Sequence, residues 1–173
     1  MQRRQFLAFM GTIGFGTLYL GSRSLVAHPV NNQLDITPLK KSEKEWRSLL
    51  SNQEFHILFE EGTEPAGSSP LNNVKEAGTF ICAACYLPLF ESKTKYESGT
   101  GWPSFYQPIS GRVDTQLDLK LIWPRTEYHC IRCGGHQGHV FEDGPEPTGL
   151  RYCNNGLALN FVPDNQALPE LRS

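Results

Sequence analysis

The chain has 173 residues, a formal net charge of −2, and 39% hydrophobic and 20% charged residues. This length allows one domain with a sizeable core, and the abundance of apolar residues excludes a wholly disordered chain. Sixteen Gly and twelve Pro are too few and too scattered for a fibrous protein, although they indicate many turns.

The first 27 residues have the features of an export signal. Arg3 and Arg4 precede an uncharged stretch, residues 5–22, which four glycines interrupt. A paired arginine, a moderately apolar core and a short polar exit resemble a twin-arginine signal. We therefore expect export to a periplasm or a thylakoid lumen, with cleavage after Ala27. The alternative is an uncleaved membrane anchor, but a span needs about 20 strongly apolar residues, so no permanent membrane span is expected.

The remaining chain divides into a linker (28–40), one domain (41–165) and a C-terminal tail (166–173). Loss of the leader removes Arg3, Arg4 and Arg23 but no acidic residue, so the domain is net acidic. Because phosphate neutralisation supplies most nucleic-acid affinity, no nucleic-acid partner is expected. No motif indicates an oligomer, and a monomer is the default expectation.

Two short helices are predicted at the start of the domain. Ser42 and Ser51 each begin a capping box that Glu45 and Glu54 complete three residues later. Apolar residues then recur at spacings of three and four, which gives each helix one buried stripe.

Short strands are predicted after a polar, Gly- and Pro-rich connection over residues 62–70. Turn residues separate the strands, and no helical pattern lies between them, which favours antiparallel sheets over βαβ units. The predicted strands are 79–82, 87–90, 117–121 (Leu alternating with Asp118 and Lys120), 126–130, 140–141, 150–153 and 157–162.

Four of the five cysteines form two Cys-x-x-Cys pairs, Cys82 with Cys85 and Cys130 with Cys133. Two turns of this kind supply the four soft ligands that tetrahedral Zn²⁺ prefers, so one structural zinc per chain is predicted. Disulfide bonding is the alternative, because an exported protein meets an oxidising compartment. His129 and His136 flank the second pair and are competing ligands, although four thiolates already complete the coordination shell.

Cys153 has no partner among these pairs. On a strand, Arg151, Cys153 and Asn155 share one face, and the nearby guanidinium is expected to lower the pKa of the thiol, as a nucleophile requires. The alternative is a buried structural cysteine.

Three longer motifs occur in order with the cysteine pairs: residues 98–105 (SGTGWPSF), 134–141 (GGHQGHVF) and 149–155 (GLRYCNN). Together they resemble the methionine-R-sulfoxide reductase (MsrB) family, over residues 41–162. The resemblance implies a mainly β fold of two antiparallel sheets with short N-terminal helices, a zinc held by both cysteine pairs, and reduction of the R epimer of methionine sulfoxide, free or in oxidised proteins.

The resemblance also assigns roles to residues. Cys153 attacks the sulfoxide sulfur, His139 donates a proton to the oxygen, and His136 orients water or substrate. Arg151 holds the thiolate and Asn155 positions the site by hydrogen bonding. Trp102 forms an apolar wall for the ε-methyl group, and Phe141 is a second substrate-binding residue.

Attack by Cys153 would leave a sulfenic acid, which a second thiol must reduce. Many family members keep a resolving Cys in or near the segment that here reads Ser98-Gly99-Thr100. A one-cysteine cycle with an external thioredoxin-like or small-thiol reductant is therefore predicted. Two rival classes are a non-catalytic zinc-ribbon binding module and a thioredoxin-like enzyme, which needs a βαβ setting.

Overall fold

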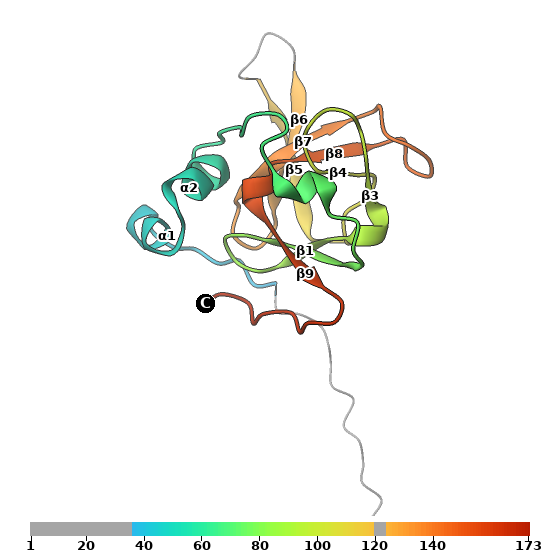
Figure 1. Cartoon of the computed structure of the whole chain (residues 1–173). Helices are drawn as coiled ribbons and strands as arrows, with labels where there is room; N and C mark the ends of the chain where they lie inside the picture. Colours follow the sequence, from blue (N-terminus) through green and yellow to red (C-terminus); the bar gives the residue numbers. More distant parts are fainter. Residues whose placement is uncertain (1–35, 120–123) are drawn as a thin grey trace, which may run out of the picture. The chain divides into compact units, whose positions relative to one another are not determined.

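The computed structural model describes residues 36–119 and 124–173 (Figure 1). The predicted leader lies outside these ranges, as do Lys120 and Leu121 at the end of one predicted strand. Among the residues described, no helix has the length and hydropathy that a bilayer span requires.

Two short helices open the described part of the chain, as predicted. Helix α1 (Glu43–Leu49) and helix α2 (Asn52–Phe59) each begin with a complete capping box, at Ser42 and Ser51. Their apolar stripes meet where Trp46 stacks on Phe59, with ring centroids 4.9 Å apart. The helices therefore add one covering layer beside the sheets (Figure 1).

In the described part of the chain, nine strands form two antiparallel sheets, which confirms the predicted mainly β fold. The smaller sheet has the order β2-β1-β9, and the larger has the order β3-β4-β8-β7-β6-β5. The same residues include three short 3₁₀ helices: η1 (Pro70–Asn73) before β1, η2 (Ser92–Thr94) between β2 and β3, and η3 (Gly156–Ala158) between β8 and β9. The strands are β1 (Gly78–Cys82), β2 (Pro88–Glu91), β3 (Lys95–Tyr96), β4 (Ser104–Phe105), β5 (Val113–Asp118), β6 (Arg125–Cys130), β7 (His136–Phe141), β8 (Arg151–Asn154) and β9 (Leu159–Pro163).

Aromatic side chains fill the space between the two sheets. Phe80 of β1 and Phe90 of β2 contact Phe105 of β4, with ring centroids 4.9 and 4.2 Å apart, and Tyr128 of β6 meets the edge of Phe90. All four residues are fully buried. Because truncation of a buried Phe typically costs about 3–5 kcal/mol, this cluster is a large part of what keeps β4 and β8 in place.

Several predicted strand boundaries differ from the structure. Strand β7 begins at His136 rather than at Val140, because its first half, His-Gln-Gly, has little intrinsic strand preference and is held by β6 and β8. The strand predicted at 117–121 is found at 113–118 as β5, and in the two shared residues the burial is reversed: Asp118 is 5% exposed and Leu117 is 64% exposed. Alternation predicts two faces and does not say which face is buried.

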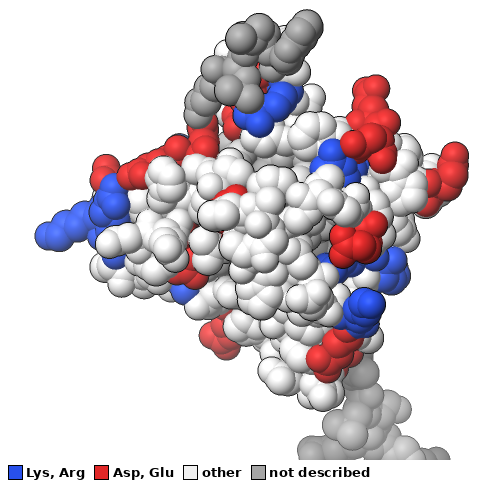
Figure 2. All heavy atoms as spheres, turned by 45° about the horizontal axis from the view of Figure 1, so that its top comes forward, with Lys and Arg blue, Asp and Glu red and all other residues white. Residues whose placement is uncertain are grey.

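The surface carries charges of both signs. On the face shown in Figure 2, acidic and basic side chains are interspersed around the margin, and much of the area between them is uncharged. This face therefore has no extended region of one sign.

Candidate active site and metal centre

Cys153 and His139 are direct neighbours across two central strands. Strands β7 and β8 pair antiparallel, with His139 opposite Cys153 and Gly138 opposite Asn154. Both residues line a cavity of about 130 Å³. Its other lining residues are Thr63, Trp102, Arg125, Gly138, Phe141, Asn154 and Asn155.

A β-bulge places the second predicted histidine beside the first. The pairing of β6 with β7 shifts between Tyr128 and His129, which leaves Gln137 as the extra residue. The rings of His136 and His139 consequently lie 5.4 Å apart, centroid to centroid. His136 is 1% exposed and does not line the cavity, so it lies behind His139 rather than on the cavity wall.

Burial decides the protonation of Cys153. Burial raises the pKa of the thiol above its usual value, while the charge of Arg151 and hydrogen bonds from Thr100 and Arg151 lower it. Arg151 thus acts in the predicted direction, but the predicted net decrease of the pKa is wrong, because burial is the larger effect. The raised pKa favours the neutral thiol near pH 7.

Arg151 is held between a carboxylate and an aromatic ring. Its guanidinium donates two hydrogen bonds to the Asp143 carboxylate, at 2.7 and 2.8 Å, and lies 4.2 Å from the centroid of Phe141. The same carboxylate raises the pKa of Cys153 and partly offsets the guanidinium. Arg151 therefore has a fixed position, and Asp143 cancels part of the effect of the Arg151 charge on the pKa of the thiol.

His139 has a carboxylate partner that the sequence analysis did not identify. Its Nε2 lies 2.9 Å from Oδ2 of Asp118, which also accepts a 2.6 Å bond from Arg125. Burial lowers the pKa of His139, and the hydrogen bond to Asp118 opposes that decrease. Asp118 thus keeps His139 more basic than burial alone would allow, and fixes the orientation of the ring.

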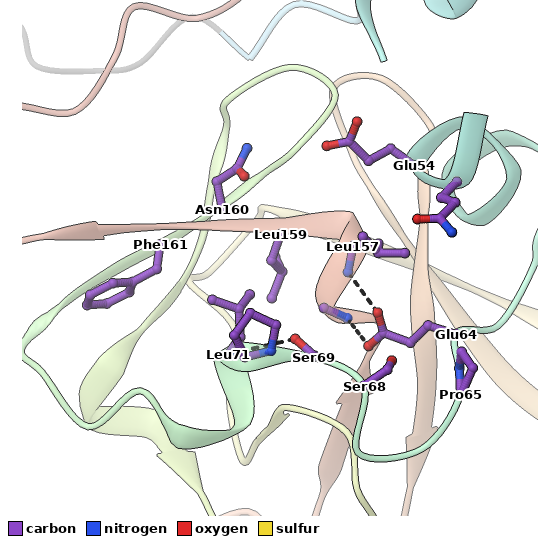
Figure 3. A pocket seen from close by; sticks show the side chains of 13 residues that line it. Glu54, Glu64, Pro65, Ser68, Ser69, Leu71, Leu157, Leu159, Asn160 and Phe161 are labelled. Atoms are coloured by element: carbon purple, nitrogen blue, oxygen red, sulfur yellow. Dashed lines mark hydrogen bonds between the residues drawn. The ribbon is translucent and has the colours of Figure 1, made fainter. Parts of the chain in front are cut away.

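Trp102 and Asn155 are joined through Glu64, a second residue that the sequence analysis missed. The indole N–H of Trp102 donates to the backbone carbonyl of Glu64, and the backbone N–H of Glu64 donates to Oδ1 of Asn155, both at 3.1 Å. The Glu64 carboxylate is buried and accepts the N–H groups of Gly156 and Leu157, as Figure 3 shows. The cavity wall is therefore tied to the turn that follows Cys153.

Strand β8 ends at Asn154, so Asn155 does not extend the strand face as predicted. Asn155 begins η3 instead, and its side-chain amide donates to the backbone carbonyl of Gln137. It still lines the cavity, because the hydrogen bonds to Glu64 and Gln137 hold it there.

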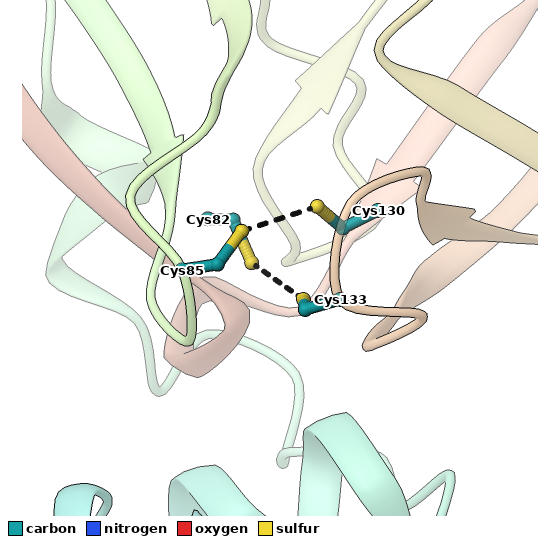
Figure 4. Close-up of side chains that lie close together, drawn as sticks. All are labelled: Cys82, Cys85, Cys130 and Cys133. Carbon is teal, nitrogen blue, oxygen red and sulfur yellow. Dashed lines mark hydrogen bonds between the residues drawn. The ribbon is translucent and has the colours of Figure 1, made fainter. Parts of the chain in front are cut away.

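The four paired cysteines converge on one point (Figure 4). Sulfur atoms of Cys82 and Cys133 lie 3.7 Å apart, and those of Cys85 and Cys130 lie 3.5 Å apart. All five cysteines of the chain are free thiols, so the disulfide alternative does not describe this structure. Four ligands at about 2.3 Å from a tetrahedral zinc are separated by about 3.8 Å, which these distances approach. The cluster therefore fits one metal ion.

Both cysteine turns have the same backbone form. A backbone N–H donates back to the carbonyl of the first cysteine in each turn, from Tyr86 to Cys82 and from Gly134 to Cys130, at 2.9 Å. Both donors have positive φ, 64° at Tyr86 and 71° at Gly134. Glycine adopts that conformation without strain, whereas the ring of Tyr86 packs against the Arg172 guanidinium, 4.4 Å from the ring centroid. The C-terminal tail thus contacts the turn that carries Cys82 and Cys85.

The fifth cysteine belongs to a different kind of site. A thiol beside an imidazole that a carboxylate orients is the arrangement of thiol-based nucleophilic enzymes. The thioredoxin-like alternative needs a parallel βαβ unit, and the strand pairs among the described residues are antiparallel.

Comparison with known proteins identifies the family. The SelR domain model matches residues 50–163. The chain therefore belongs to the SelR family, and the resemblance to methionine-R-sulfoxide reductases is confirmed.

Curated relatives agree with this assignment. A peptide methionine sulfoxide reductase MsrB of Leptospira interrogans is 52% identical over 124 residues, which cover 71% of this chain and 95% of the relative. One from Methanosarcina barkeri is 50% identical over 129 residues, covering 74% and 91%. The chloroplastic peptide methionine sulfoxide reductase B1 of Arabidopsis thaliana is 50% identical over 121 residues, covering 69% and 60%.

The charge balance at Cys153 predicts opposite effects of two substitutions. Asp143→Asn removes a charge that raises the thiol pKa, so iodoacetamide should alkylate Cys153 faster at pH 8, by about three- to tenfold. Arg151→Met removes the opposing charge and should slow alkylation by a similar factor. Rates that change in the same direction would contradict this account.

The cysteine cluster predicts that a metal ion stabilises the fold. Chelation, or the substitution Cys130→Ser, should remove one metal ion per chain and lower the thermal midpoint. A ligand present at a thousand times its Kd contributes about 4 kcal/mol. The control Cys153→Ser should keep both the metal and the midpoint, and equal losses in the two variants would show that the cluster is not the metal site.

Proposed function

We propose that this protein reduces the R epimer of methionine sulfoxide in oxidised proteins to methionine. The observation that carries the proposal is the placement of the Cys153 thiol opposite His139 in a cavity walled by Trp102 and Phe141. Curated relatives at about half identity are named peptide methionine sulfoxide reductases. A cavity of about 130 Å³ has room for the end of one side chain, which favours methionine within a polypeptide.

The chemistry needs a thiolate and an acid together. Sγ of Cys153 bonds to the substrate sulfur while His139 protonates the sulfoxide oxygen. The sulfur–oxygen bond of the substrate and the new sulfur–sulfur bond then break: the hydroxyl passes to Cys153, and the electron pair of the sulfur–sulfur bond stays on the methionine sulfur. Methionine leaves with two more electrons, and Cys153 becomes a sulfenic acid.

An external thiol completes the cycle. A first thiol condenses with the sulfenic acid to give a mixed disulfide and water, and a second thiol displaces Cys153. A dithiol of thioredoxin type or two small thiols can fill these roles. Two observations support a one-cysteine cycle. The four other cysteines are gathered in the four-thiol cluster. In the segment where many family members keep a resolving Cys, this chain has Thr100, whose hydroxyl hydrogen-bonds to Cys153.

Two further proposals concern the metal and the compartment. We infer that the cluster of Cys82, Cys85, Cys130 and Cys133 holds one zinc ion, because four soft thiolate ligands in a closed shell suit Zn²⁺. Zinc there would join the two turns and supply stability rather than reactivity. Export through the twin-arginine leader rests on residues 3–22 alone.

A single-turnover experiment without reductant tests the proposed reaction. Peptides that contain the R or the S epimer of methionine sulfoxide are mixed with reduced protein, and methionine and protein mass are measured. We expect one methionine per chain from the R epimer, and a Cys153 adduct of one oxygen atom. The S epimer and the Cys153→Ser variant should give none.

Other outcomes would overturn parts of the proposal. Methionine formation by Cys153→Ser would exclude Cys153 as the nucleophile. A new disulfide at Cys153 within the chain would exclude the one-cysteine cycle.

A further inference from the structure

Behind the active-site histidine lies a second set of metal-ligating side chains, formed by Glu127 and His129 of β6 and His136 of β7. One ligand atom from each lies within 4.8 Å of the others. Glu127 is 4% exposed and His136 is 1% exposed. These three side chains group with one another and not with the four thiols, so neither histidine completes the cysteine cluster.

The imidazole of His129 and the carboxylate of Glu127 face each other in this set. Nδ1 of His129 lies 3.2 Å from the carbonyl oxygen of Gly134, which can only accept, so Nδ1 carries a hydrogen and is not the ligand atom. Nε2, the other ring nitrogen, lies 3.3 Å from Oε1 of Glu127, which also accepts a hydrogen bond from Gln116.

The distances within this set are those of ligands that share one metal ion. Nδ1 of His136 also lies 3.3 Å from the Glu127 carboxylate, at Oε2. Charge-assisted hydrogen bonds are about 2.7–2.9 Å long. Two ligands at about 2.0–2.1 Å from one tetrahedral ion are instead separated by about 3.3 Å.

Solvent reaches this set at His129. His129 and Gln116 line a hollow of about 380 Å³ that also includes Glu61 and Asp114. The side chain of His129 is 15% exposed, so an ion can enter there and keep a water ligand. The nearby Asp118 is less suitable as a ligand, because it already binds Arg125 and His139.

We propose that Glu127, His129 and His136 bind one divalent ion of the borderline class, such as Zn²⁺, Ni²⁺ or Co²⁺, separate from the four-thiol site. Two imidazoles and one carboxylate are ligands that these ions favour. The site lies directly behind His139, so an ion there fixes His136 against the active-site ring. The proposal does not depend on the proposed reductase activity.

The test is a Co²⁺ titration of the purified protein that already holds its metal in the four-thiol site. We expect one additional equivalent, with the weak visible bands of nitrogen and oxygen ligation and no sulfur-to-cobalt charge-transfer band. His129→Gln should weaken this binding by more than about 100-fold. The matched control is His56→Gln, since His56 is exposed on α2 and pairs with a single carboxylate, Glu60. That variant should bind as the wild type does.

Retention of the first metal equivalent checks that His129→Gln is folded. Independently of any variant, the Co²⁺-loaded wild type should show two paramagnetically shifted imidazole N–H resonances. The proposal is overturned by the absence of a second equivalent, by equal binding in the two variants, or by the absence of those two resonances.

Discussion

Strands β7 and β8 pair in one register, and this pairing sets Cys153 opposite His139. A shift by one residue would turn every side chain of a strand to the other face. Two contacts oppose such a shift. Gly138 approaches β8 so closely that a Cβ there would lie 1.9 Å from the carbonyl oxygen of Cys153, and the Tyr128 hydroxyl donates to Asn154 at 2.6 Å. Glycine at 138 and the buried Tyr128 thus determine which side chains share the cavity.

The pair of Cys153 and His139 is partly buried, and burial changes the pKa of both groups. It raises the pKa of Cys153 and lowers the pKa of His139, which favours the neutral form of both groups near pH 7. The thiolate with a protonated imidazole contains the same number of protons as the neutral pair. The fraction of molecules in the thiolate–imidazolium form therefore does not change with pH between the pKa of His139 and the pKa of Cys153. Arg151 and Asp118 favour the charged forms, and that is the role the structure supports for both residues.

Much of this arrangement could be predicted from the sequence. The capping boxes locate both helices, the two Cys-x-x-Cys turns locate the four-thiol cluster, and the unpaired cysteine locates the thiol that lines the cavity. These signals are local, because each depends on a few residues close together in the chain.

The missed features depend on contacts between distant segments. Asp118 contacts His139 from another strand, and Glu64 reaches Trp102 and Asn155 from a loop. Each is one acidic residue in a polar context, so spacing does not distinguish it from a solvated surface group. The direction of the Cys153 pKa shift also could not be predicted from the sequence. The sequence shows the charge of Arg151, which lowers the pKa, but it does not show how deeply Cys153 is buried, which raises it.

The central claim is that His139 supplies a proton to the sulfoxide oxygen while Cys153 attacks the sulfur. The most direct measurement compares two reactions of the same thiol in His139→Asn, namely single-turnover methionine formation and alkylation by iodoacetamide, which needs no acid. General acid catalysis contributes about 10²–10⁴-fold. Methionine formation should fall by at least about 100-fold while alkylation changes only a few-fold. Equal losses in both reactions, or none in methionine formation, would contradict the account.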